Sequence, residues 1–291
     1  MFVFMQSIAA FEQRFVDDLS RLYHADEIRQ LYYLLVEHRF GWSKTTYLLN
    51  RQSPLGEEDA TWLMFALSEL LQAKPIQYIL GHVWFMGMKL AVSTAVLIPR
   101  PETEELVQLI INHQSTGASL RIIDIGTGSG CIAIALKKAL PQAHVYALDV
   151  SDDALCVARR NAESQSAPIN FIHADILEWE LIFQNEQRFD IVVSNPPYIT
   201  AAEQIDMHSN VLEYEPHLAL FVRGEAPLLF YEHIGAFASY HLQTGGDLYV
   251  EINRNYGEAV VDLFQKKGLE IVKLHQDMQG ADRMVHAKKN N

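Results

Sequence analysis

The segment Leu120–Gly130 reads LRIIDIGTGSG, and an apolar stretch follows it from Cys131 to Leu140. The run that ends at Ile125 has the length and composition of a buried β-strand, and the glycines after it mark a tight loop. The stretch after the loop is long enough for a helix. The segment therefore predicts a strand, a glycine loop and a helix in succession, which is the repeating unit of a parallel α/β sheet.

The same alternation of strand and helix continues along the chain. Strands are expected at residues 144–148, 169–173 and 189–194, and Ser151 is expected to cap a helix after the first of these. Further on, the pattern predicts helices at 228–240 and 257–267 and strands at 247–252, 270–274 and 283–287. These repeated units predict a doubly wound, Rossmann-like α/β sheet whose ligands bind beyond the carboxyl ends of its strands.

Residues 1–74 have a different pattern and predict a small helical domain. Apolar residues recur there at helical spacing from Phe4 to Leu19 and again from Ile28 to Val36. Acidic residues at 57–59 favour the first turn of a further helix, because the helix dipole stabilises negative charge there. The buried apolar face of that helix is expected to comprise Trp62, Phe65, Ala66 and Leu70.

A β-hairpin linker is expected at residues 75–100, and the α/β domain at residues 101–291. Short strands are predicted at 83–85, 89–92 and 95–98, with a turn at Gly87. The linker ends at Arg100, which lies between two prolines, and Pro101 suits the first position of a helix. Because the prolines hold this part of the chain extended, we expect the arginine to have a fixed partner. Helix-dipole complementarity by itself would explain the acidic residues that follow, Glu102 among them.

Composition and charge narrow the class of protein. The chain has 291 residues, 49% of them hydrophobic and 20% charged, which describes a globular protein with a substantial core. A net charge of −13 argues against a surface that follows a nucleic-acid backbone, so no direct nucleic-acid binding is expected. No apolar run reaches the length of a membrane span. The two cysteines, Cys131 and Cys156, indicate neither a disulfide framework nor a metal site, so we expect a cytoplasmic protein without a metal.

The glycine loop predicts a binding site for S-adenosylmethionine. It lacks a glycine at Cys131, which the dinucleotide pattern requires, and it lacks the Gly-Lys-Ser/Thr of a phosphate-binding P-loop. A carboxylate two residues before the first glycine would repel a pyrophosphate but suits the ammonium and sulfonium of S-adenosylmethionine. The glycines let the backbone approach the ligand, and the next helix N-terminus can receive a carboxylate. The residues assigned to this site are Asp124, Gly126, Thr127, Gly128, Ser129 and Gly130.

Two further carboxylates follow the ends of neighbouring strands. Asp149 stands 25 residues after Asp124, at the end of the next strand, and can accept both ribose hydroxyls of the donor. Asp175 follows the third strand and is placed to meet the adenine amino group. A tight structural turn is the alternative for the glycine loop alone, and a structural role stays open for Asp175.

A rigid elbow follows the fourth strand, where Asn195, Pro196, Pro197 and Tyr198 come in succession. Each proline fixes its own φ, and Pro196 also restricts Asn195, so the backbone is stiff at the carboxyl end of the strand. A planar NH2 group could be held there by the Asn195 oxygen and the Pro196 carbonyl, with Tyr198 over one face. Such a grip would aim a weakly nucleophilic amide nitrogen at a methyl donor and catalyse transfer by positioning. A Pro-Pro turn beside a core tyrosine is the structural alternative.

These motifs together resemble the PrmC/HemK group, the glutamine N5-methyltransferases that modify peptide chain release factors. The resemblance covers nearly the whole chain and rests on Pro75–Gly81, Leu97–Glu104, Asp124–Gly130, Val193–Tyr198, Tyr214–Pro216 and Leu218–Leu220. It implies an N-terminal helical domain that helps to hold the release factor, and a substrate glutamine in a Gly-Gly-Gln loop. It also implies that Gly126, Gly128, Asp149 and Asn195 contact the donor and that Asn195–Tyr198 hold the glutamine. Arg100 and Glu102, within the matching segment, are assigned to substrate binding.

The sequence departs from the family pattern in three places. Ile176 stands where some relatives place an aromatic residue beside the adenine, residues 221–226 lack the usual glycine-rich acidic form, and Asn253 and Tyr256 replace more typical Gly and Gln. None of these positions belongs to the expected chemistry. They bear on the finer contacts to substrate and adenine.

Other functions stay open at this stage. Adenine-N6 nucleic-acid methyltransferases share the Asn-Pro-Pro-Tyr elbow, although the net charge of −13 counts against that class. A ribosomal-protein glutamine methyltransferase would use the same chemistry, but its segment around Arg100 differs. A protein that binds the donor without turnover is the non-enzymatic alternative.

Overall fold

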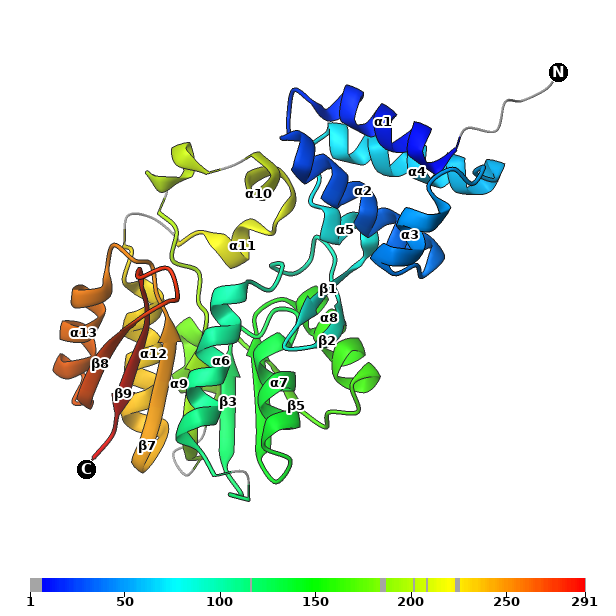
Figure 1. Cartoon of the computed structure of the whole chain (residues 1–291). Coiled ribbons are helices and arrows are strands. Elements are labelled where there is room, and N and C mark those ends of the chain that lie inside the picture. Colours follow the sequence, from blue (N-terminus) through cyan, green and yellow to red (C-terminus); the bar gives the residue numbers. More distant parts are fainter. Residues whose placement is uncertain are drawn as a thin grey trace. The chain divides into compact units, whose positions relative to one another are not determined.

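The computed structural model describes residues 7–115, 117–183, 187–200, 202–207, 209–222 and 226–290 (Figure 1). Phe4 and the part of segment 221–226 at 223–225, both named above, lie outside these ranges. The chain divides into two compact units. One contains the residues up to Gly81 together with residues 209–214, and the other contains residues 82–207 and 215 onward. The first unit is therefore built from two separate stretches of chain.

The first unit is helical, as the N-terminal pattern predicts. Its core is formed by one face of each of the first four helices and closed by Ile76. Serine side chains cap two of these helices, Ser7 accepting from the Ala10 N–H and Ser43 from the Thr46 N–H, each at 3.2 Å. The helices of this unit are α1 (Ile8–Leu19), α2 (Ala25–Phe40), α3 (Lys44–Asn50), α4 (Glu57–Leu71), α5 (Ile76–Leu80) and α10 (Ser209–Tyr214).

Two expectations about this region were wrong. Phe65 is 54% exposed, since the core-facing residues of α4 are Leu63, Leu67 and Leu70 at helical spacing, and Phe65 points to another side of the helix. Residues 76–80 are helical instead of belonging to a hairpin linker. Helix α5 begins directly after Pro75 and ends at Gly81, which takes the left-handed conformation (φ 72°) that glycine adopts without strain.

The second unit contains a two-stranded hairpin and a seven-stranded sheet. The hairpin pairs β1 (His82–Phe85) with β2 (Met88–Ala91) in antiparallel register. The third linker strand expected at 95–98 is absent. Instead of pairing with a strand, the Val96 N–H donates to the Ser93 carbonyl, and the Ile98 N–H donates to the Glu215 carboxylate.

The large sheet has the strand order β5-β4-β3-β6-β7-β9-β8, and its first five strands run parallel. Strand β9 is antiparallel to both of its neighbours. The strands are β3 (Arg121–Ile125), β4 (His144–Asp149), β5 (Asn170–His173), β6 (Phe189–Ser194), β7 (Leu242–Glu251), β8 (Glu270–Gln276) and β9 (Asp282–Lys288). This topology confirms the α/β, Rossmann-like methyltransferase fold class.

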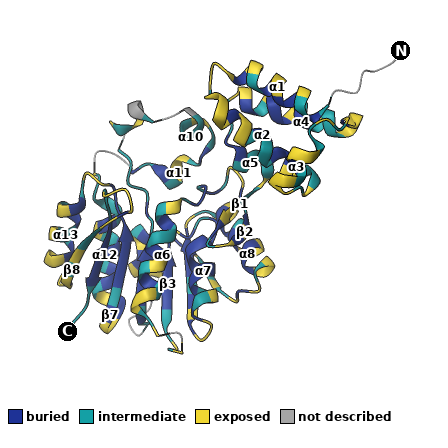
Figure 2. Cartoon of the chain, viewed as in Figure 1, coloured by how far each residue is buried: buried dark blue, intermediate teal, exposed yellow. Residues whose placement is uncertain are grey.

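Helices cover both faces of the sheet, because its central strands are apolar on both sides (Figure 2). Ile122 belongs to the core under α6 and α7, and its neighbour Ile123 to the core under α9, α12 and α13. Figure 1 shows α6 and α7 in front of the strands and α12 behind them. The remaining elements are α6 (Pro101–His113), α7 (Cys131–Ala139), α8 (Asp152–Ser164), η1 (Ile176–Glu178), α9 (Trp179–Ile182), η2 (Glu203–Asp206), α11 (His217–Leu220), α12 (Leu229–His241) and α13 (Gly257–Lys266).

The register of the sheet brings the predicted polar residues to one edge. Ile125 on β3 is paired with Leu148 on β4 and with Ser194 on β6. The residues that follow these three positions are Gly126, Asp149 and Asn195. The glycine loop, the acid after β4 and the elbow after β6 therefore start level with one another at the carboxyl ends of neighbouring parallel strands.

Candidate active site

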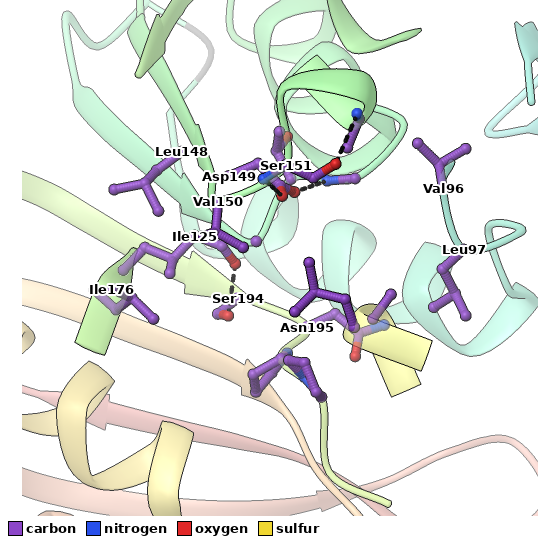
Figure 3. Close-up of a pocket in the computed structure, with 18 of the residues that line it drawn as sticks. Val96, Leu97, Ile125, Leu148, Asp149, Val150, Ser151, Ile176, Ser194 and Asn195 are labelled. Carbon is purple, nitrogen blue, oxygen red and sulfur yellow. Dashed lines mark hydrogen bonds between the residues drawn. The ribbon is translucent and has the colours of Figure 1, made fainter. Parts of the chain in front are cut away.

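A pocket lies at this edge of the sheet, within the second unit (Figure 3). Its wall combines the glycine loop, the end of β4, the residues after β5 and the elbow after β6. Residues 95–97, Pro99 and Thr103, together with residues of α7, α8, α11 and α12, complete it. Figure 3 shows Ser194 and Asn195 on the opposite side of the pocket from Asp149 and Ser151.

The glycine loop is held by backbone hydrogen bonds to the next strand. The N–H groups of Gly126 and Thr127 both donate to the Leu148 carbonyl, at 2.8 and 2.9 Å. Gly126, Gly128 and Gly130 have φ values of 73°, 53° and 81°, in the left-handed region where a side chain is strained. The loop residues Gly126, Thr127, Gly128 and Ser129 line the pocket. Gly130 is instead the residue before α7 and packs against Ile134 and Ala158.

Asp149 lines the pocket and also ties the glycine loop to β4. One carboxylate oxygen accepts from the Gly128 N–H at 2.8 Å, and the other accepts from the Ser151 N–H at 2.9 Å. Burial raises the pKa of Asp149, and the backbone hydrogen bonds act in the opposite direction. Each carboxylate oxygen has a further lone pair, so Asp149 can accept from a ligand hydroxyl while it holds the loop.

Asp124 is fully buried and is not among the residues that line the pocket. The Thr127 hydroxyl donates to its Oδ2 at 2.6 Å, and its Oδ1 has no hydrogen-bond partner of normal geometry among the described residues. Burial raises the pKa of Asp124 to about 7 against the hydrogen bonding. Direct contact between this carboxylate and a ligand cation therefore stays a prediction. Thr127 does line the pocket, and its hydrogen bond connects the pocket wall to Asp124.

Asp175 and Ile176 lie beside each other on the pocket wall. The Asp175 carboxylate accepts from the Leu177 N–H at 2.9 Å and so caps the short helix η1. This is the structural role that the sequence left open, and contact with an adenine amino group remains a prediction. Ile176 is buried, with 6% of its surface exposed, and presents an aliphatic surface where an aromatic ring was noted as absent.

The elbow is anchored to the sheet by Ser194, whose hydroxyl donates to the Ile125 carbonyl at 2.7 Å (Figure 3). Asn195, Pro196 and Pro197 all line the pocket. The Asn195 side-chain NH2 group donates to the Thr103 hydroxyl at 3.2 Å. Tyr198 is not part of the pocket wall, and its hydroxyl donates to Glu251 over 3.5 Å. Burial raises the pKa of Tyr198 above its ordinary value, so the phenol keeps its proton.

Arg100 and Glu102 are not among the residues that line the pocket. The Arg100 guanidinium forms an ion pair with Glu215, whose side chain is 1% exposed. The prediction that this arginine has a fixed partner is therefore confirmed. Glu102 lies half-buried in the first turn of α6. The assignment of these two side chains to substrate binding stays a prediction.

Four polar residues near the site were not found from the sequence. Thr103 lines the pocket beside Asn195, and Glu251 accepts from Thr103 at 2.7 Å. Asn161 on α8 is 1% exposed and donates to the Ser129 carbonyl and the Ala91 carbonyl, each at 2.9 Å, which joins the glycine loop to the hairpin. Asn253, noted above only as a departure, donates to the Tyr198 carbonyl at 3.4 Å. Thr103 stands in the conspicuous Pro-Glu-Thr-Glu segment, whereas the other three carry no local sequence signal.

Two other classes of site are not found among the described residues. None of the helices in those parts of the chain is both long and apolar enough to cross a membrane. Within the same residues, no group of three or more histidine, cysteine, aspartate or glutamate side chains could hold a metal ion.

Two family models match the chain. Residues 14–81 match the PrmC N-terminal domain, and residues 102–235 match the methyltransferase small domain. The first match lies in the helical unit, and the second contains the glycine loop, Asp149 and the elbow.

Curated relatives match over almost their whole length. A protein of Flavobacterium psychrophilum named release factor glutamine methyltransferase is 43% identical over 281 residues, which cover 96% of this chain and 98% of that protein. A protein of Bacteroides thetaiotaomicron with the same name is 38% identical over 285 residues, 98% of this chain and 100% of that protein.

Solved structures match at the level of the fold. A methyltransferase from Pyrococcus furiosus superposes with a TM-score of 0.51 at 17% identity and covers 81% of this chain and 100% of its own. At this low identity the match supports the methyltransferase fold and nothing finer.

Proposed function

The chain belongs to the release factor glutamine methyltransferase family, and we propose that its pocket holds the methyl donor while the elbow holds the substrate glutamine. The family resemblance read from the sequence is confirmed, and the protein is a methyltransferase that uses S-adenosylmethionine to modify a release factor glutamine. The observation that carries the assignment of residues is that Asp149 and Asn195 line one pocket from opposite sides.

The residues of the pocket fit S-adenosylmethionine, which supplies a methyl group on a sulfonium when it is bound. The left-handed glycines leave the loop without side chains, so a ligand can approach its backbone. Ser129 lines the pocket, and its hydroxyl is a buried polar atom without a hydrogen-bond partner among the described residues, so we assign it to a ligand carboxylate. Asp149 accepts from the ribose hydroxyls, and Asp175 is assigned to the adenine.

The elbow positions the amide that receives the methyl group. Asn195 Oδ1 and the Pro196 carbonyl accept the two hydrogens of the substrate NH2 group and turn its nitrogen lone pair toward the donor. Because charge develops on these N–H groups as the new bond forms, the two acceptors stabilise the transition state more than the ground state. The double proline keeps both acceptors in place, so little reorganisation is needed.

The peptide chain release factor is the proposed protein partner, with the nitrogen of the Gly-Gly-Gln glutamine, N5, as the site of methylation. We assign release factor docking to the helical unit, which matches the N-terminal domain of the family. Relatives with this name favour this function over an adenine-N6 nucleic-acid methyltransferase, a ribosomal-protein glutamine methyltransferase and a protein without turnover.

The test is methyl transfer from labelled S-adenosylmethionine, with release factor and adenine-containing duplex DNA offered in parallel and mass spectrometry to locate the label. Asn195→Ala should bind the donor normally and lower the transfer rate about 10²- to 10³-fold, as expected for loss of one preorganised hydrogen-bonding group. Asp149→Ala should weaken donor binding. Asn112→Ala, an exposed change on α6, is the matched control and should behave as wild type.

Each variant tests a separate part of the proposal. Normal transfer by Asn195→Ala would overturn the role of the elbow, and unchanged donor affinity in Asp149→Ala would overturn the assignment of the donor site. Label on DNA adenine would reject the proposed substrate.

A further inference from the structure

A buried chain of hydrogen bonds runs behind the elbow and ends at a carboxylate. The Asn195 NH2 group donates to Thr103 Oγ1 at 3.2 Å, and the Thr103 hydroxyl lies 2.7 Å from Glu251 Oε2. Three different elements supply these residues: the end of β6, the first turn of α6 and the end of β7. Thr103 and Glu251 are each 2% exposed, so water does not compete for the bond between them, whereas Asn195 is half-buried on the pocket wall.

When Glu251 is ionised, the chemistry of the three groups fixes the direction of every bond in this chain. An ionised carboxylate only accepts, and a threonine hydroxyl has a single hydrogen to donate. When Thr103 gives its hydrogen to Glu251, its oxygen can only accept from Asn195. The Asn195 NH2 group must then face Thr103, and because the amide is planar, Oδ1 points the other way.

We propose that Thr103 and Glu251 are positioning residues for methyl transfer, because they hold the side-chain amide of Asn195 with its oxygen free to accept from the substrate. This inference rests on the proposed role of Asn195 and adds two residues that do not themselves touch the reacting atoms. Only one orientation of the Asn195 amide allows this hydrogen bond. An amide turned by 180° would direct its own NH2 group at the NH2 group of the substrate, and two donors cannot bond to each other.

The position of Glu251 supports a functional role for its charge. Burying a carboxylate is unfavourable unless hydrogen bonds compensate for lost solvation, so an apolar residue would serve a purely structural purpose better. Here the acceptor oxygens are used by two donors, one beside the elbow and one within it: Thr103 donates to Oε2, and the Tyr198 hydroxyl donates to Oε1 over 3.5 Å. The same carboxylate therefore orients both polar side chains of the Asn-Pro-Pro-Tyr motif.

The groups around Glu251 place the change in its protonation state near neutral pH. Burial raises the pKa of Glu251 to about 7, and the nearby Glu102 on α6 acts in the same direction. Arg283 on β9 and the hydrogen bonds from Thr103 and Tyr198 act against it. On α12, the Tyr231 hydroxyl donates to the backbone carbonyl of Glu251 over 3.4 Å, and burial keeps this phenol protonated.

Protonation of Glu251 would remove the constraint on Asn195. A neutral carboxyl has a hydrogen to donate, so it can donate to Thr103, and the Thr103 hydroxyl can then donate to Asn195 Oδ1. Both orientations of the asparagine amide become possible, and only one of them is productive. We therefore expect the transfer rate to fall as the pH drops through about 7, while donor affinity changes little.

The experiment measures single-turnover transfer from labelled S-adenosylmethionine to purified release factor, with the full chain, between pH 5.5 and 9. Thr103→Val keeps the shape but removes the hydroxyl. It should lower the rate about 10- to 100-fold, by analogy with the loss of a residue that orients a metal ligand. Thr103→Ser restores the hydroxyl and should recover most of the rate. Thr244→Val, an exposed change on β7, is the control.

Two further measurements separate positioning from general structural damage. Glu251→Gln cannot titrate, so it should lose the acidic limb of the pH–rate profile. In an Asn195→Ala background, Thr103→Val should have no further effect on the rate, because the amide that Thr103 orients is gone. A general structural defect would instead lower the rate below that of Asn195→Ala alone.

The outcomes distinguish this inference from the function it rests on. If Thr103→Val transfers at the wild-type rate while Asn195→Ala is impaired, the positioning role is wrong and the elbow stands. If Asn195→Ala is also unimpaired, the role of the elbow itself fails. An acidic limb that persists in Glu251→Gln would overturn the assignment of the titrating group, even if Thr103→Val did not fold.

Discussion

Gly130 connects the glycine loop to α7, and its replacement by alanine should destabilise the α/β unit through steric crowding. A Cβ atom at this position would lie 3.1 Å from Ile134 Cδ1 and 3.2 Å from Ala158 Cβ. These contacts are tighter than ordinary van der Waals separations, and they involve two helices, α7 and α8. Ile134 Cδ1 ends a flexible side chain and can shift by a few tenths of an ångström. Ala158 cannot turn its Cβ away, and its Cα would also lie 3.4 Å from the new atom, so the contact with α8 must give.

Gly128→Ala is the matched comparison, because it separates crowding from backbone strain. Both glycines have positive φ, 53° at Gly128 and 81° at Gly130, but a Cβ at Gly128 would meet nothing within 4 Å. Left-handed strain, roughly 1–2 kcal/mol, and the loss of glycine's freedom in the unfolded chain act in both variants. The excess at Gly130 is the overpacking term, about 1–3 kcal/mol.

Urea denaturation of the donor-free protein measures this difference, and hydrogen exchange over residues 121–165 assigns it to the α/β unit. Gly130→Ala should unfold at lower urea than Gly128→Ala, and both should unfold at lower urea than wild type. Equal midpoints for the two variants would refute the reasoning, since they would mean that Ile134 and Ala158 yield without a measurable loss of stability.

Two further predictions concern buried charge. Arg100→Ala should lower the free energy of unfolding by about 3 kcal/mol, the lower end of the range for breaking a buried ion pair, because Arg100 is 35% exposed. Arg100→Lys should recover part of this loss. A loss below about 1 kcal/mol, measured by thermal denaturation, would contradict the prediction. Asp124 and Glu251 each have a pKa of about 7, well above the ordinary 3.8 and 4.5, so the folded protein binds these protons more tightly than the unfolded chain. Their stabilising contribution is complete below about pH 4 and is lost as the pH rises to about 7. Above pH 7 the stability no longer changes through these two groups. Asp124→Asn with Glu251→Gln should therefore gain several kcal/mol, at most roughly 7, relative to wild type between pH 4 and pH 8, and a pH-independent difference in chemical denaturation would reject the assignment.

Local patterns predicted much of the fold and of the pocket. The strand that ends at Ile125 with its glycine loop, the acid after the next strand and the elbow after β6 are each readable within a few residues, because each strand end lies where an apolar run stops. Parallel pairing then brings the ends together without further information, since the carboxyl ends of neighbouring parallel strands share one edge.

The supporting network could not be predicted in the same way. Thr103 and Glu251 are 148 residues apart in the chain and meet only because α6 packs across β7. The error at Phe65 has a related cause, since periodicity gives the spacing of an apolar face but not its centre when several apolar residues adjoin. Residues 95–98 have a strand-like pattern, but no neighbouring strand is present to pair with them. Strand pairing depends on the rest of the fold, so a local pattern could not predict this.

The two-stretch construction of the helical unit has a consequence for synthesis on the ribosome. Residue 209, the first described residue of the second stretch, comes 128 positions after residue 81, where the first stretch ends (209 minus 81). At about 5–20 residues per second, the ribosome needs roughly 6–25 s to make the interval, which includes the strands from β1 to β6. Helices α1–α5 therefore leave the ribosome long before Tyr214 can donate to the Gln72 carbonyl, at 2.8 Å in the finished protein. The N-terminal unit starts folding first, yet it can be completed only after more than half of the large sheet has been made.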